Sequence, residues 1–454
     1  MADGAGFSVA LRPNGEDATS YVLDPYFARA PGGDGAFAIE SSAIKFGRGV
    51  LAEVGAEARA LGLRRVGLFT DRRVRALEPY ARLYRSLVDA GLDIAVYSDV
   101  AVEPTDRSFL AAARFASEAA VDGFVSLGGG SVIDTTKAAN LFSTWPAEFL
   151  AYVNAPIGRA KPVPGPLKPH IACPTTFGTA SETTGIAVCD LLDLRLKSGI
   201  VSRRIRPTLG VLDPSNLQHL PPLVVAANGF DVLSHAIESF TARPFTQRPA
   251  PAGPTLRPLS QGANPYSDQS CLQAIRIAAQ YLERAVSDPE DYVARDNLMF
   301  AGLLAGIGFG NAGNHLPHAM SYPVAGKVKS FTAPGWPDDE PLIPHGIAVV
   351  VNAPAAFRLT AQATPSRHAT VLEALGLPVP HNSDAIGEAL ADRLVALMRT
   401  TGIPNGLSGV GYGEDDVFTL ADGAFQQKRL IDNAPRPVTL TDLEALFRAA
   451  LIYW

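Results

Sequence analysis

The apolar residues of this chain follow one spacing up to Asp213-Pro214 and a different spacing after it. Up to that point, short β-branched runs alternate with amphipathic stretches such as residues 50–61 and 108–120. The strand candidates are residues 65–70, 93–98, 123–127, 170–173 and 209–212. Short apolar strands separated by helical segments are typical of a largely parallel sheet that is covered by helices on both faces.

After Asp213-Pro214, nearly every apolar stretch has the spacing of an α-helix. The helix candidates are residues 224–240, 267–286, 294–306, 346–357, 383–399 and 441–451. Two segments rich in proline and glycine, residues 243–265 and 327–344, interrupt this part and predict surface loops. We therefore expect an N-terminal extension over residues 1–35, a nucleotide-binding α/β domain over 36–213 and an all-α, metal-binding domain over 214–454.

The composition excludes several classes of protein. Apolar residues make up 47% of the 454 positions and charged residues 19%, which is typical of a chain that folds into globular domains. The 39 basic and 45 acidic residues give a net charge of −6 without a basic run, so we expect no nucleic-acid partner. No stretch reaches the roughly 18 apolar residues that a membrane helix needs, so we expect no membrane association.

The cysteines and the N-terminus bear on the cellular location. The chain has three cysteines, Cys173, Cys189 and Cys271, without CxxC spacing, which fits a reducing compartment. Residues 1–27 contain no basic segment that leads into an apolar one, unlike a signal or transit peptide. We expect a cytoplasmic protein.

A glycine-rich turn follows one of the predicted strands. The sequence GGGS at residues 128–131 comes directly after the strand at 123–127 and opens a predicted helix at 131–141. Glycines let the backbone approach a ligand closely, and a helix N-terminus offers unpaired N–H groups that suit a pyrophosphate. The alternative is a tight turn with a capping box, because Ser131 and Asp134 have the S-x-x-D spacing.

Polar residues also follow two other predicted strands. Asp71 comes after the strand at 65–70. An acid there can accept hydrogen bonds from the adenosine ribose and repels a 2′-phosphate, which favours NAD over NADP. The alternative, which the sequence by itself favours, is a helix N-cap. The hydroxyl-rich stretch at 174–184 follows the strand at 170–173, and it is either the lining of a nucleotide site or an ordinary polar loop.

The helical part contains an acid and histidines with the spacing of metal ligands. Asp231 and His235 lie four residues apart in a strongly helical segment, so an oxygen and a nitrogen ligand share one helix face. His318 and His345 lie elsewhere in the same part. One Asp and three His suit Fe(II) or Zn(II) with an open coordination position. The alternative for each histidine taken singly is a packed or capping side chain.

His315, His318 and Tyr322 have the i, i+3 and i+7 spacing that places side chains on one face, if this stretch is helical.

These residues occur in a fixed order with further motifs. The order is Asp71, Gly128-Gly129-Gly130-Ser131 with Asp134 and Lys137, Pro174-Thr175-Thr176 with Gly178 and Ser181-Glu182, Asp213-Pro214, residues 231–238, Pro317-His318-Ala319-Met320 and Pro344-His345-Gly346. From about Ile39 to the C-terminus, the chain resembles the iron-containing (group III) alcohol dehydrogenases. Residues 102–106, 155–158, 306–313 and 320–323 are similar to the hydroxyacid-oxoacid transhydrogenase branch of that family.

The resemblance implies a Rossmann-like N-terminal α/β domain, a helical C-terminal domain of the dehydroquinate-synthase type and a cleft between them. It implies that the metal ligands are Asp231, His235, His318 and His345. It implies that NAD is bound by Asp71, Gly128, Gly129, Gly130, Ser131, Asp134, Thr175, Thr176 and Ser181. The donor set does not distinguish Fe(II) from Zn(II), and the resemblance favours Fe(II).

The chain departs from the family pattern at two places. Tyr322 stands where many members carry a histidine that is often assigned to proton relay, which leaves that role open. Our catalytic candidates are Tyr322, His315 and Lys197. Lys197 occupies a position that is often charged in the family. The gap between His318 and His345 is longer than in simpler members, so residues 327–343 form an insertion that could act as a lid.

The resemblance predicts hydride transfer between a small hydroxy acid, such as 4-hydroxybutyrate, and an oxo acid, such as 2-oxoglutarate, through bound NAD. A carboxylate substrate needs a cation, and our candidates are Arg159 and Lys161. Family members commonly form homo-oligomers of two or more copies. The alternatives are an ordinary NAD-dependent alcohol dehydrogenase or aldehyde reductase, a metal- and NAD-dependent carbon–oxygen lyase and a non-catalytic binding protein.

Overall fold

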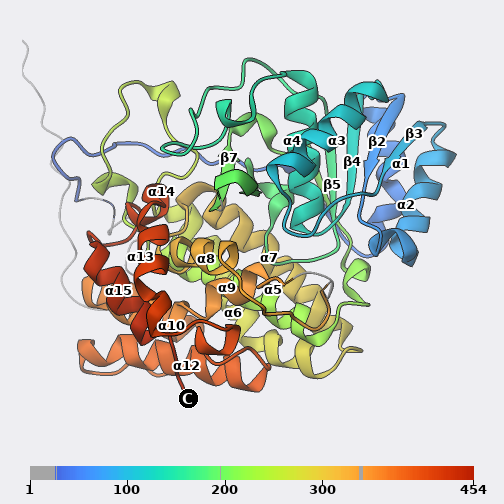
Figure 1. Ribbon diagram of the computed structural model, residues 1–454. Coiled ribbons are helices and arrows are strands. Elements are labelled where there is room, and N and C mark those ends of the chain that lie inside the picture. The colour runs from blue at the N-terminus through green and yellow to red at the C-terminus, as the bar shows by residue number, and fades with distance from the viewer. Residues whose placement is uncertain (1–25, 27, 195, 337–340) are drawn as a thin grey trace, which may run out of the picture.

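The first half of the chain forms a six-stranded parallel sheet. The computed structural model describes residue 26 and residues 28–194, 196–336 and 341–454. The strands, in their order across the sheet, are β1 (Ala43–Phe46), β8 (Leu209–Leu212), β5 (His170–Pro174), β4 (Gly123–Gly128), β2 (Arg65–Phe69) and β3 (Asp93–Tyr97). Every neighbouring pair is parallel. The sheet occupies the upper right of Figure 1.

Helices cover both faces of this sheet, as the apolar pattern predicts. The helices are α1 (Val54–Ala60), α2 (Glu78–Asp89), α3 (Asp106–Glu118) and α4 (Gly130–Thr144). Residues of α1 and α2 pack with strand residues in one apolar cluster, and residues of α3 and α4 pack with strand residues in another. The N-terminal strand β1, the helix α2 and an antiparallel pair, β6 (Ile186–Leu191) with β7 (Leu196–Val201), are not among the predicted elements.

The second half is helical, and its helices share one large apolar core. They are α5 (Pro222–Thr241), α6 (Pro265–Ser287), α7 (Tyr292–Ala312), α8 (Leu316–Gly326), α9 (His345–Val350), α10 (Ala353–Ala363), α11 (Pro365–Ala374), α12 (Ile386–Thr400), α13 (Val417–Phe425), α14 (Lys428–Ile431) and α15 (Leu440–Ala449). The helix α5 packs against α6, α7 and α9, and nearly all of its residues are buried. Within the described residues, no helix is long and apolar enough to cross a membrane.

The stretch that the sequence predicts as one helix, residues 346–357, is two helices. The first, α9, ends at Val350, and α10 begins at Ala353 with Pro354 in its first turn. Proline has no N–H to donate to the preceding turn, so it ends one helix and is tolerated at the start of the next. The break turns the chain at Val351 and Asn352, just after the helix that begins at His345.

Candidate metal and nucleotide site

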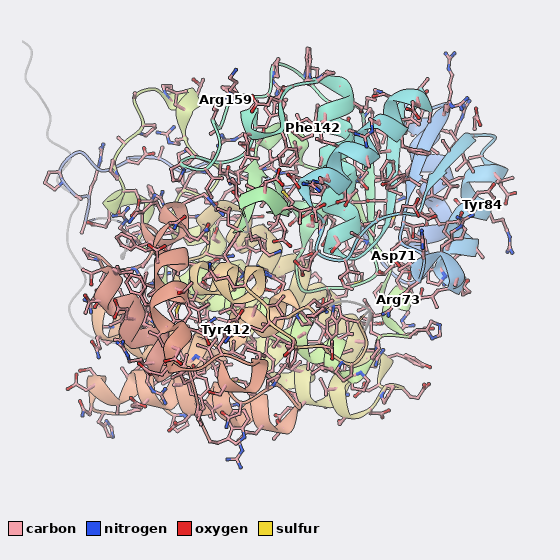
Figure 2. All side chains as sticks on the ribbon, viewed as in Figure 1. Asp71, Arg73, Tyr84, Phe142, Arg159 and Tyr412 are labelled. Carbon is pink, nitrogen blue, oxygen red and sulfur yellow. The ribbon has the colours of Figure 1, made fainter. Side chains whose placement is uncertain are left out.

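A cleft of about 470 Å³ is lined by residues of both the sheet and the helical part. On the sheet side it is lined by Asp71, Gly129 and Thr175, which lie within two residues of the ends of β2, β4 and β5. In a parallel sheet the carboxyl ends of the strands meet at one edge, which is where open α/β sheets bind ligands. Figure 2 shows Asp71 and Arg73 at the edge of the α/β part that faces the helices.

Four side chains converge on the helical side of the cleft. Asp231 and His235 extend from α5, His318 from α8, and His345 is the first residue of α9. One potential ligand atom from each of the four lies within 4.8 Å of the others. The structure therefore brings together all four residues that the resemblance implies as metal ligands.

The distances within this cluster fit a single ion. The Oδ1 atom of Asp231 lies 3.6 Å from His235 Nε2, 3.5 Å from His318 Nε2 and 3.7 Å from His345 Nε2. Ligands about 2.1 Å from a tetrahedral ion are separated by about 3.4 Å. Asp231 Oδ1 and His318 Nε2 are buried and have no hydrogen-bond partner among the described residues. Buried polar atoms are normally satisfied, so these atoms point to a missing partner.

Burial and the charges within the cluster set the pKa values of Asp231 and His235. Burial lowers the pKa of His235 to about 3, so its imidazole is neutral, which a metal ligand requires. Burial by itself would raise the pKa of Asp231, but the surrounding histidines outweigh it and hold that pKa below its usual range. The side chain of His345 is 29% exposed, whereas those of Asp231 and His235 are 3% exposed, so the cluster opens to the cleft on the His345 side.

Glu238 is a further part of the cluster that was not among our candidates. It lies on α5, three residues after His235, and its side chain is fully buried. Its Oε2 is hydrogen-bonded to Nδ1 of His318, and its Oε1 accepts the backbone N–H groups of His315 and His318 at 3.0 and 3.1 Å. A carboxylate on the second ring nitrogen orients a metal-binding histidine. The i+3 spacing from His235 is the sequence signal that could have identified it.

The glycine-rich turn after β4 leads directly into α4. The N-cap of α4 is Gly129, and no side chain caps this helix. The alternative of a capping box formed by Ser131 and Asp134 is therefore wrong. The carboxylate of Asp134 instead accepts hydrogen bonds from the Ser181 hydroxyl and, at 2.9 Å, from the backbone N–H of Val188. Gly129 and Ser131 line the cleft, so the uncapped N-terminus of α4 faces it.

The other nucleotide candidates divide into two groups. Gly130, Asp134, Thr175, Thr176 and Ser181 also line the cleft. Gly128 is the last residue of β4 and is not among the lining residues. A Cβ at Gly128 would lie 2.4 Å from Val132 Cγ2, so the position requires glycine for packing.

Asp71 has both of the features that the sequence suggests. Its Oδ1 accepts the backbone N–H groups of Arg73 and Val74, both at 2.9 Å, which is the capping role. Its side chain also lines the cleft. A carboxylate has a second oxygen, so the capping bonds leave Asp71 able to accept a further hydrogen bond.

Asn228 connects the two sides of the cleft, and it too was not among our candidates. It lies on α5, three residues before Asp231. Its Oδ1 accepts the backbone N–H groups of Phe177 and Gly178 at 3.1 and 2.7 Å. A Cβ at Gly178 would lie 3.1 Å from Asp231 Oδ2. The loop after β5 is thus held directly against the helix that carries Asp231.

The three catalytic candidates occupy different places. Tyr322 on α8 and Lys197 on β7 line the cleft. The Nζ of Lys197 lies 2.6 Å from Glu103 Oε2 and 3.0 Å from Asp190 Oδ1. Burial by itself would lower the pKa of Lys197, but these two carboxylates raise it above its usual range. Lys197 is therefore a charged, ion-paired side chain.

His315 does not reach the cleft. It is the N-cap of α8, and its Nδ1 accepts the N–H of Leu316 at 2.7 Å. Its Nε2 lies 3.0 Å from the Thr241 hydroxyl, and its side chain is fully buried. Because α8 begins at Leu316, the prediction that His315 shares a helix face with His318 and Tyr322 is wrong, and we assign His315 a capping role.

The two cations predicted to bind the substrate carboxylate lie on the surface. Arg159 is exposed, and its guanidinium lies 2.6 Å from the Glu148 carboxylate (Figure 2). Lys161 is exposed as well, and neither residue lines the cleft. The structure contradicts this placement, because the backbone N–H groups of Arg159 and Lys161 bond to Leu150 and Ala151 in the loop after α4, outside the lining of the cleft.

The segment between α8 and α9 reaches the α/β part. Gly335 and Trp336 line the cleft, and the carbonyl oxygen of Gly335 accepts a hydrogen bond from Arg73 at 3.1 Å. Residues 337–340 of the predicted lid lie outside the described residues.

Known families and proteins match nearly the whole chain. Residues 41–214 match the family described as iron-containing alcohol dehydrogenase, and residues 259–451 match the C-terminal part of the Fe-containing alcohol dehydrogenase family. The mitochondrial hydroxyacid-oxoacid transhydrogenase of Bos taurus is 48% identical over 92% of this chain and 90% of its own length. The probable mitochondrial hydroxyacid-oxoacid transhydrogenase of Dictyostelium discoideum is 42% identical over 95% and 84%.

Solved structures share the fold over the same extent. The crystal structure of 1,3-propanediol oxidoreductase superposes with a TM-score of 0.80 at 27% identity and covers 91% of this chain and 100% of its own. A sulfoacetaldehyde reductase from Bifidobacterium kashiwanohense in complex with NAD⁺ superposes with a TM-score of 0.74 at 25% identity and covers 92% and 98%.

The expectation of a cytoplasmic location is wrong. The similar transhydrogenases of Bos taurus, Mus musculus, Homo sapiens and Dictyostelium discoideum are all described as mitochondrial. The three cysteines are free and buried. A shortage of disulfides indicates a reducing compartment and does not distinguish the cytosol from the interior of an organelle.

Proposed function

Because this chain belongs to the iron-containing alcohol dehydrogenase family, we propose that it transfers a hydride between a hydroxy acid and an oxo acid through a nicotinamide nucleotide held in the cleft. The support from relatives is 48% identity to a hydroxyacid-oxoacid transhydrogenase over nine-tenths of both chains. The observation that carries the proposal is the placement of a four-ligand cluster and a strand-end nucleotide site in one cleft.

The residues of the cluster fit a divalent metal ion. One carboxylate and three imidazoles, with unpartnered ligand atoms and an opening towards the cleft, suit an ion with a coordination position for substrate. We propose Fe(II) rather than Zn(II) on the family resemblance. When bound, the ion supplies Lewis acidity to the substrate oxygen and the nucleotide supplies a hydride acceptor.

The chain provides the positioning for this chemistry. Glu238 fixes the orientation of His318, and the uncapped N-terminus of α4 offers backbone N–H groups to a pyrophosphate. Asp71 offers its second carboxylate oxygen to the adenosine ribose, which favours NAD over NADP. Burial of Asp231, His235 and His318 limits the access of water to the cluster.

Tyr322 is our candidate for the proton step. When the carbinol C–H bond breaks, its electron pair leaves with the hydride, and the hydroxyl proton must leave separately. Tyr322 lines the cleft on the same helix as His318, one turn further along. A phenol can both donate and accept a hydrogen bond, so it can pass that proton towards solvent.

The transhydrogenase proposal requires that the nucleotide stay bound while the two acids exchange. We propose 4-hydroxybutyrate as the hydride donor and 2-oxoglutarate as the acceptor for the test. The purified protein is mixed with both acids and no free NAD, and initial rates are measured over both concentrations. We expect turnover and parallel lines in double-reciprocal plots. An absence of turnover until free NAD is added would instead make the protein an ordinary NAD-dependent dehydrogenase.

A further inference from the structure

The substrates of the proposed reaction carry carboxylates, and the cleft contains few cations that are free to bind them. Lys197 is already paired with Glu103 and Asp190. Arg73 donates to the carbonyl oxygen of Gly335. Arg429 also lines the cleft, and its guanidinium forms neither a hydrogen bond nor an ion pair with any residue that the structure describes.

Arg429 lies where the main cleft adjoins a smaller cavity. It belongs to the short helix α14 and lines both the main cleft and a small cavity next to it. Tyr322 lines the same two cavities. Arg429 is therefore next to the side chain that we propose for the proton step, and it is half-buried rather than exposed on the surface.

Two further arginines, Arg243 and Arg248, lie near Arg429 behind the lining of the cleft. The pKa of Arg248 is lowered to about 10, chiefly by burial and then by the positive charges of Arg243 and Arg429. The nearby Asp432 opposes this effect. Among the described residues, no carboxylate lies within ion-pair distance of the three guanidinium groups. Three cations without an ion-pair partner favour an anionic ligand.

Two buried polar side chains of the cleft also lack partners. Ser260 is 8% exposed and Asn314 is 7% exposed, and both line the cleft. The Ser260 hydroxyl and the Asn314 Oδ1 have no hydrogen-bond partner in the described part of the chain. A serine hydroxyl can donate to a carboxylate, and the asparagine amide can turn its nitrogen towards one.

Asn433 links these side chains to the arginines. It is four residues after Arg429, and its Nδ2 donates to the carbonyl oxygen of Asn314 at 3.1 Å. Its Oδ1 accepts from Arg248 at 2.6 Å, and its backbone oxygen accepts the N–H of Arg243 at 3.0 Å. Asn433, four residues along the chain from Arg429, thus joins the backbone of Asn314 to the guanidinium of Arg248.

We propose that Arg429, with Ser260 and Asn314, binds the carboxylate of the acid substrates and thereby selects acids over neutral alcohols. This inference rests on the proposed function, since it names the substrate-binding residues of the same site. A planar guanidinium can bind both oxygens of a carboxylate at once, which fixes the orientation of the acid.

The test compares Arg429→Gln and Arg429→Lys with a matched control, Arg276→Gln. Arg276 is exposed on α6, away from the cleft. The first measurement is calorimetric binding of succinate, an unreactive dicarboxylate. We expect Arg429→Gln to weaken binding about 10- to 100-fold, which is the range for losing one hydrogen bond to a charged group. We expect a smaller loss for Arg429→Lys and no change for Arg276→Gln.

The second measurement is the half-reaction with bound NAD⁺, followed by nicotinamide absorbance. We expect Arg429→Gln to raise the half-saturating concentration of 4-hydroxybutyrate by the same factor and to leave that of 1-butanol unchanged. Equal shifts for both donors, or succinate binding as tight as in the wild type, would overturn the inference. Weakened NAD binding by the variant would also overturn it, by assigning Arg429 to the nucleotide phosphates.

The two measurements separate this inference from the proposed function. If the wild type oxidises neither donor, the proposed function fails, and the succinate titration still decides the role of Arg429. If the wild type does not bind succinate, the inference itself is wrong. Thermal unfolding of each variant checks that the fold is unchanged.

Discussion

Glu238 determines how His318 is presented to the cleft. It holds Nδ1 of the imidazole and the backbone N–H of the same residue, so Nε2 is the nitrogen that remains for a metal. The carboxylate is fully buried, so the interaction is not weakened by solvent. A histidine in this position can bind a metal without losing further rotational freedom.

Replacing Glu238 by glutamine should therefore weaken metal binding. The amide is similar in size but removes the negative charge that faces His318, and losses of about 10- to 100-fold are typical for such changes. We expect this loss when Fe(II) or Zn(II) is titrated into the metal-free variant against a competing chelator. Glu283→Gln, at a partly exposed glutamate on α6, is the control. Metal affinity equal to that of the wild type in E238Q would show that Glu238 does not support the site.

The elements that place the site differ in how far the sequence predicts them. The strands β2, β4 and β5 are predicted almost to the residue because each is a short apolar run followed by a polar turn. The strand β1 and the hairpin of β6 and β7 escape prediction. Residues of β6 alternate between buried and half-buried positions, so the pattern depends on neighbours that the sequence does not identify.

The turn between β4 and α4 is the place where a substitution can test nucleotide binding. A Cβ at Gly129 would lie 3.3 Å from the Thr176 Oγ1 and would stand where a ligand must approach the backbone. We expect Gly129→Ala to weaken NAD binding roughly tenfold. This change in affinity corresponds to a loss of about 1.4 kcal/mol in the free energy of binding. The measurement is a fluorescence titration with NAD.

Gly253→Ala is the matched control for this change, because a Cβ at Gly253 meets no atom within 4 Å. It should bind NAD as the wild type does. If Gly129→Ala also binds NAD with unchanged affinity, the nucleotide does not lie on the turn before α4.

At the scale of the whole molecule, each half of the chain contributes only part of the site. The sheet supplies the strand ends, and the helices α5, α8 and α9, labelled in Figure 1, supply the four candidate ligand side chains. Helical spacing predicts that Asp231 and His235 share a face, but their convergence with His318 and His345 is tertiary. The family resemblance, rather than any local pattern, carries that part of the prediction.

The difference between local pattern and tertiary placement also explains why the prediction for Arg159 and Lys161 is wrong. Arg159 and Lys161 are charged residues near a motif, and sequence gives no information on whether such residues face a cleft or solvent. Arg429 is distant in sequence from every motif, so nothing in the sequence marks it. Assembly into a homo-oligomer stays a prediction.

Transfer of an isotope between the two acids tests the central claim most directly. The protein is given 4-hydroxybutyrate with deuterium on its carbinol carbon, unlabelled 2-oxoglutarate and no free nucleotide, and the products are analysed by mass spectrometry. We predict deuterium on the carbinol carbon of 2-hydroxyglutarate, in an amount that exceeds the protein present. A 2-hydroxyglutarate product without deuterium, or labelled product only after free NAD is added, would contradict the account.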